Sequence, residues 1–183
     1  MGVMHVSSSK DITVEDYIDE FLNGFEPPTP VLFRFMIRIC RSSELLPRST
    51  AKYIDLAELY WFGYGVSDEQ INVASTEIMS LQKISNDYLC HELRIDWQYV
   101  PLNVSSNSMT AKKVAEYHVL RAERCVVITK KDYFDQSGLS FHYFVDAMQF
   151  AHESTNPEFK FKMTETLVKC LEEYAQSPYE LSA

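Results

Sequence analysis

The sequence predicts an all-α fold. Only 5 of its 183 residues are glycine, and apolar side chains recur at intervals of three and four residues, which is typical of amphipathic helices rather than strands. Two segments begin with a helix-capping pattern, Thr13 followed by Asp16 and Ser67 followed by Gln70. We predict seven helices, at residues 14–23, 30–42, 50 to 59 or 61, 68–89, 110–124, 140–151 and 156–174.

The first two predicted helices are separated by a proline-rich link. Thr13 caps the first helix, and Gly24 is placed to end it because glycine adopts the left-handed conformation that follows many helices. Thr29 and Pro30 then open the second helix, which reaches Ser42. This second helix is apolar nearly all round, so we expect it to lie in the core or against a partner.

The third and fourth predicted helices are separated by a glycine-containing loop. Ser49 or Thr50 caps the third helix, and the capping box at Ser67 opens the fourth, which is the longest. One stripe of apolar and small residues follows the longest helix: Ile71, Ala74, Ile78, Leu81, Ser85 and Tyr88 or Leu89. We expect this helix to be the centre of a bundle, with Leu81 in its packed core.

The second half of the chain alternates loops and helices. From Asp96 to Ser108 a proline and a run of Asn and Ser residues indicate a surface loop. After the helix that Thr110 caps, residues 125–128 are apolar and β-branched, and periodicity leaves them as either a strand or the buried end of that helix. Ser140 opens the next helix. The last helix has an inner stripe of Met163, Leu167, Leu171 and Tyr174.

The composition is that of a globular protein, with 46% hydrophobic and 23% charged residues. The 17 basic and 26 acidic residues give a formal charge of −9, which argues against a nucleic-acid binder and fits a cationic partner better. No stretch is apolar enough to span a membrane, and the start of the chain lacks the order of a secretion signal. The cysteines, Cys40, Cys90, Cys125 and Cys170, match neither a disulfide framework nor a zinc spacing. We expect an intracellular protein, in the nucleus or cytoplasm, with reduced thiols.

The sequence has no phosphate-binding glycine pattern, no His-Glu-x-x-His and no nucleophile elbow. Cys90 and His91 are neighbours, so on a helix they point about 100° apart and cannot share one ion. His118 and Cys125 are spaced to share a helical face, but two residues do not complete a zinc site. We expect no catalytic activity, no cofactor and no metal. The competing hypothesis is an enzyme whose site is assembled from scattered residues, Cys90, His118 and His142 among them.

Three motifs follow one another between Ile18 and Ile84. The first is an apolar helix that ends in Phe21-Leu22 and is followed by Phe25 and by Pro28-Thr29-Pro30-Val31-Leu32-Phe33. The second is Ser49-Thr50-Ala51-Lys52-Tyr53-Ile54. The third runs from Gln70-Ile71 through Ala74 to Leu81-Gln82-Lys83-Ile84. In this order they resemble a mitotic, B-type cyclin, from the last helix of the first cyclin box through the first three helices of the second. The chain departs from the family at Arg34-Phe35-Met36, where cyclins have Leu-Arg-Arg, and at Glu77, where they are apolar.

The resemblance implies a cyclin-box-like helical bundle over residues 30–130. A segment with one helix, residues 1–29, would precede it, and additional C-terminal helices in residues 131–183 would pack on it. The implied function is that of a non-catalytic regulatory subunit or adaptor, with a cyclin-dependent kinase among its candidate partners. In cyclins a glutamate of the last helix of the first box contacts the kinase, and Glu15 lies next to the corresponding position.

A chain with one box would leave apolar surface near Phe25, Phe35 and Ile39. We predict a contact there with a separate protein, with a second copy of the chain in a homodimer, or with the chain's own helices from Ser140 to Tyr174. Together with Glu15, these three residues form the predicted partner-binding site. The alternative is an acidic helical inhibitor or effector, unrelated to cyclins, that presents its charge to a basic target.

Overall fold

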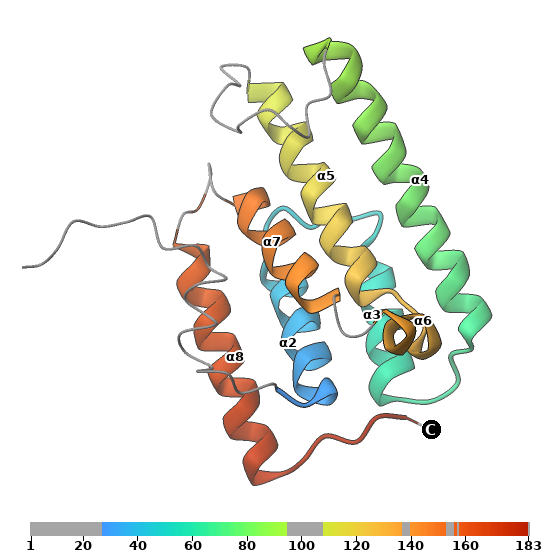
Figure 1. Ribbon diagram of the computed structural model, residues 1–183, viewed down its shortest axis with the longest axis vertical. Helices are drawn as coiled ribbons and strands as arrows, with labels where there is room; N and C mark the ends of the chain where they lie inside the picture. Colours follow the sequence, from blue (N-terminus) through green and yellow to red (C-terminus); the bar gives the residue numbers. More distant parts are fainter. Residues whose placement is uncertain (1–26, 95–107, 137–139, 153–155, 157, 183) are drawn as a thin grey trace, which may run out of the picture.

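The computed structural model describes residues 27–94, 108–136, 140–152, 156 and 158–182. Over these residues the chain forms seven helices and no strand (Figure 1), so the all-α prediction is confirmed. The helices are α2 (Thr29–Ser42), α3 (Ala51–Phe62), α4 (Asp68–Leu93), α5 (Ser108–Val126), α6 (Lys130–Asp135), α7 (Ser140–His152) and α8 (Phe159–Gln176). The predicted helix at residues 14–23 lies outside the described residues.

Helix α2 is the centre of the bundle, and α3, α5, α7 and α8 all contact it. Its buried residues cover every side of the helix except the one with Arg34, Arg38 and Arg41: Val31, Leu32, Phe33, Phe35, Met36, Ile37, Ile39 and Cys40. The expectation that the helix at residues 68–89 is central is therefore wrong. That helix, α4, lies at one edge of the molecule beside α5 (Figure 1), because much of its circumference is polar and remains exposed to solvent.

Aromatic side chains from distant parts of the sequence meet around α2. The rings of Phe33 and Trp61 stack with centroids 3.5 Å apart, and the Tyr133 ring meets Phe33 edge-on at 4.8 Å. On another side of α2, Phe35 packs against Phe141 and Phe144 of α7. Helices α6 and α7 therefore complete the core that α2 and α3 begin, so the C-terminal helices belong to the same bundle.

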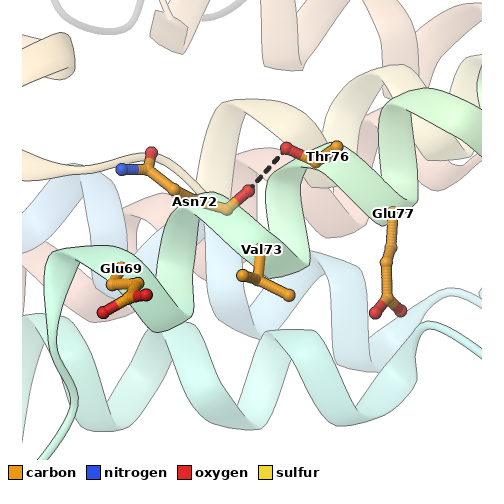
Figure 2. A pocket seen from close by; sticks show the side chains of 5 residues that line it. All are labelled: Glu69, Asn72, Val73, Thr76 and Glu77. Carbon is orange, nitrogen blue, oxygen red and sulfur yellow. Dashed lines mark hydrogen bonds between the residues drawn. The ribbon is translucent and has the colours of Figure 1, made fainter.

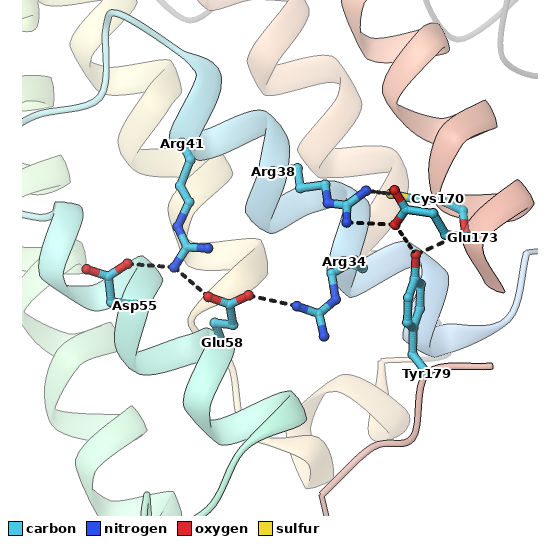
Figure 3. Close-up of polar contacts among 8 residues, drawn as sticks. All are labelled: Arg34, Arg38, Arg41, Asp55, Glu58, Cys170, Glu173 and Tyr179. Carbon is cyan, nitrogen blue, oxygen red and sulfur yellow. Dashed lines mark hydrogen bonds and ion pairs between the residues drawn. The ribbon is translucent and has the colours of Figure 1, made fainter. Parts of the chain in front are cut away.

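The three arginines of α2 attach their neighbours to the central helix (Figure 3). Glu58 of α3 accepts hydrogen bonds from Arg34 at 2.7 Å and from Arg41 at 2.6 Å, one on each carboxylate oxygen. Arg38 donates to Glu173 of α8 at 2.7 Å, and this bond is the main reason that the pKa of Glu173 is lowered to about 2. The polar side of α2 thus holds α3 and α8 in place.

Helix α4 begins as the sequence predicts. The Ser67 hydroxyl accepts from the backbone N–H of Gln70 at 3.3 Å, and the Gln70 side chain accepts from the Ser67 N–H at 2.9 Å, which completes the capping box. Leu81, however, is not a core residue, because 37% of its surface is exposed. Eleven residues make about three helical turns, so Gln82 rather than Leu81 lies in line with the buried Ile71.

The segment after α5 contains a short helix that was not predicted. Residues 125 and 126 are the last residues of α5, which settles the choice between strand and helix for this part of the segment. Thr129 then caps α6, since its hydroxyl accepts from the Asp132 N–H at 3.1 Å and donates to the Asp132 carboxylate at 2.7 Å. A Thr followed three residues later by Asp is the sequence signal for this helix.

Candidate functional site

The cysteines and histidines considered for catalysis or metal binding do not form a site. Cys90 packs beside Leu89 and Val114, whereas His118 packs against the ring of Phe150 with centroids 5.4 Å apart. His142 is exposed on α7. Within the ranges given above, no group of three or more His, Cys, Asp or Glu residues could hold a metal ion.

A serine and a histidine do meet in the core, but closed off from solvent. The Ser43 hydroxyl lies 2.9 Å from Nε2 of His152, whose ring stacks on Phe159 with centroids 3.7 Å apart. Both polar residues are buried, and burial lowers the pKa of His152 to about 4. No described residue hydrogen bonds to Nδ1 of His152 to orient the ring. Without an orienting group or room for a substrate, the pair acts as a structural contact.

The predicted partner-binding residues lie either in the core or outside the described ranges. Phe35 and Ile39 are completely buried, so neither presents an interface at the surface. Of the three occupants considered for this apolar region, the chain's own helix α7 packs against Phe35. Glu15 and Phe25 lie outside the described residues. The physical reason is that a helix that is apolar nearly all round is most stable when other helices cover its apolar sides.

Helix α4 presents a long outer face that the rest of the bundle does not cover. We define this outer face by Glu69, Val73, Glu77, Ser80 and Ile84, which lie four, four, three and four residues apart and therefore share one side of the helix. Val73 is 56% exposed and Ile84 is 66% exposed. The opposite side of α4 packs on the bundle through Ile71, Ala74, Ile78, Ser85 and Leu89, all of which are buried.

A shallow hollow of about 460 Å³ lies along the first half of this outer face, lined by Glu69, Asn72, Val73, Thr76 and Glu77. Figure 2 shows Glu69, Val73 and Glu77 extending from the same side of α4. The Thr76 hydroxyl donates to the backbone carbonyl of Asn72 at 2.8 Å, which satisfies its donor inside the helix. The hollow therefore offers an apolar centre between two carboxylates.

The outer face of α4 was not predicted from the sequence. Its signal is present in the sequence, because Val73 and Ile84 follow a second helical stripe opposite the core stripe. Single exposed apolar residues are common on protein surfaces, however, so this stripe alone does not indicate a binding site. The structure adds the decisive fact that no described helix covers it.

Comparison with known proteins finds no matching family model, no matching curated protein and no matching solved structure. None of the helices in the described part of the chain is long and apolar enough to cross a membrane.

Proposed function

We propose that this chain is a non-catalytic protein-binding module whose docking surface is the outer face of α4. The observation that carries the proposal is the one-sided packing of α4. This helix has 26 residues, and it joins the bundle on one side, where Ser85 donates to the Lys113 carbonyl of α5 at 3.3 Å and Gln82 accepts from Arg124 at 2.9 Å. Its other side exposes Val73 and Ile84 to solvent.

The chemistry of the outer face specifies the kind of partner. Val73 lies between the carboxylates of Glu69 and Glu77, which are four residues away on either side. A partner segment with an apolar side chain flanked by Lys or Arg residues would bury the valine and pair with both carboxylates. The formal charge of −9 on the whole chain would also attract such a segment at long range.

The resemblance to mitotic cyclins supports a regulatory role within this proposal, and it makes a cyclin-dependent kinase one candidate partner. The position of α4 at the edge of the bundle departs from the arrangement expected from that resemblance. The binding proposal therefore rests on the exposed face of α4, and the kinase is a candidate to be tested by direct binding to the purified chain.

The proposal is tested by Val73→Asp and Ile84→Asp, with Met79→Asp as the matched control. Met79 is also an exposed apolar residue of α4 but lies outside the outer face. A partner isolated with the wild-type chain is purified and its dissociation constant is measured by calorimetry. We expect each outer-face variant to weaken binding by at least tenfold, because it places a carboxylate in the apolar contact, while Met79→Asp binds as the wild type does.

Equal affinities for all four proteins would contradict the proposal. Light scattering provides a second test, because a dimer that dissociates in Val73→Asp and Ile84→Asp would show that a second copy occupies the outer face instead of a different protein. Circular dichroism of each variant checks that it is folded. We expect all three variants to fold, because Val73, Met79 and Ile84 are exposed.

A further inference from the structure

A second hollow lies where α5, α6 and α7 meet beside Ser75 of α4, which is not a residue of the outer face. Its volume is about 290 Å³, and the residues that matter for its chemistry are Arg121, Arg124, Cys125, Asp132, Ser140 and Tyr143. Pockets that enclose drug-sized molecules measure roughly 300–1,000 Å³. This hollow therefore matches a small ligand or the end group of a larger one.

Two arginines give the hollow its charge. Arg121 and Arg124 form no ion pair with any described residue, in contrast to the three arginines of α2. Arg124 donates to the neutral amide of Gln82 at 2.9 Å, and the Arg121 guanidinium lies 5.9 Å from the centre of the Tyr143 ring. Two arginines without acidic partners are unexpected in a chain with 26 acidic and 17 basic residues.

The remaining lining residues leave the hollow with a net positive charge. Asp132 is the one acid among the lining residues, and its carboxylate already accepts a hydrogen bond from Thr129 at 2.7 Å. Burial raises the pKa of the Cys125 thiol to about 12, so this residue is neutral and adds no negative charge. Ser140 is the first residue of the 13-residue helix α7, whose N-terminus carries partial positive charge.

We propose that this hollow binds the phosphate group of a phosphomonoester. The inference rests on two arginines three residues apart on α5 that line one small hollow, with the hydroxyl-bearing residues Ser140 and Tyr143 also among its lining residues. A guanidinium donates two parallel hydrogen bonds to a phosphate, and hydroxyls donate to the remaining oxygens. The phosphate belongs either to a free small molecule or to a phosphorylated side chain, and both sources present the same dianionic group.

The test is an NMR titration of the ¹⁵N-labelled chain with inorganic phosphate and, separately, with O-phosphoserine. We expect saturable shifts at Arg121, Arg124 and the start of α7, with dissociation constants of about 1 mM or lower. Because the hollow has room for more than a phosphate group, we expect O-phosphoserine to bind more tightly. Tighter binding of inorganic phosphate would also support a phosphate site and would identify free phosphate as its source.

Arg121→Gln and Arg124→Gln should each weaken binding of the tighter probe by tenfold or more, because each removes a charged pair of donors. Lys169→Gln is the matched control, since it removes one positive charge from an exposed position on α8 and leaves the hollow intact. Absence of saturable shifts in the wild type, or an equal loss of affinity in Lys169→Gln, would overturn the proposal. None of these variants replaces a residue of the outer face of α4, and Arg121→Gln also leaves the Arg124–Gln82 contact with α4 in place, so this test is separate from that of the proposed function.

Discussion

Glu123 of α5 is completely buried, and its surroundings raise the pKa of its carboxyl above that of an ordinary glutamate. Burial raises its pKa from 4.5 to about 7, although a hydrogen bond with Thr50 acts in the opposite direction. The Thr50 hydroxyl lies 2.6 Å from Oε1 of Glu123 and 3.1 Å from the Pro47 carbonyl. Because this hydroxyl has one proton to donate, both contacts are hydrogen bonds only when Glu123 is protonated.

This arrangement predicts that Glu123→Gln stabilises the protein at alkaline pH. The carboxyl ionises near pH 4.5 in the unfolded chain but near pH 7 in the folded one, so the contribution of this carboxyl to wild-type stability falls as the pH rises between these values. Between pH 5 and pH 8 the wild type should lose about 2 kcal/mol through this group, and the glutamine variant should not.

Urea unfolding at the two pH values measures this difference in the free energy of unfolding. Glu165→Gln is the control, because Glu165 is an exposed glutamate of α8 and its replacement should change stability by less than about 0.5 kcal/mol. If the free energies of unfolding of Glu123→Gln and the wild type changed by the same amount between pH 5 and pH 8, folding would not shift the pKa of Glu123 and the prediction would be wrong.

At the scale of the element, α4 shows that two apolar residues three positions apart on one helix can differ in burial. Ile78 is completely buried in the main core, whereas Leu81 is 37% exposed although it lies only three residues away. The sequence stripe includes both residues, because a three-residue step and a four-residue step are equally compatible with an amphipathic helix. The bundle decides between them, since α5 lies on the side of α4 where Gln82 and Arg124 meet.

Alanine substitutions at the two positions should therefore have different effects. We expect Ile78→Ala to lower the free energy of unfolding by about 2–5 kcal/mol, because it leaves a cavity in a packed core. Leu81→Ala should cost less than about 1 kcal/mol, because solvent already reaches this side chain. Thermal or urea unfolding of the two variants makes the comparison, and equal losses would place Leu81 in the core after all.

At the scale of the whole molecule, two buried histidines make the fold sensitive to acid. Burial lowers the pKa of His118 and of His152 from 6.5 to about 4. The unfolded chain takes up protons at these residues below pH 6.5 while the folded chain does not, so stability falls as the pH drops from 6.5 towards 4. Protonation of Glu123 opposes this loss over the same range, but two histidines act against one glutamate.

We therefore predict that the wild type is less stable at pH 4.5 than at pH 7, by a net amount of about 2 kcal/mol. In Glu123→Gln the loss over this range should be larger, because the opposing contribution of the carboxyl is absent. The urea midpoint at both pH values tests the two statements together. A wild-type midpoint that is equal or higher at pH 4.5 would show that the histidines are protonated within the folded protein.

Local chemistry determined most of the helices in advance. Proline at the start of α2, the capping box of α4 and the opening of α7 at Ser140 act within a few residues of the chain, so each predicts a helix start without knowledge of the fold. The nearly complete apolar circumference of α2 likewise indicated burial. Only the tertiary structure decided which elements bury α2: helix α7 covers Phe35, so there is no interface at that residue. It also decided that no described helix covers the outer face of α4. Only the tertiary structure likewise formed the hollow with Arg121. Ser140 and Tyr143 come from another helix, and no local sequence pattern predicts which helices become neighbours.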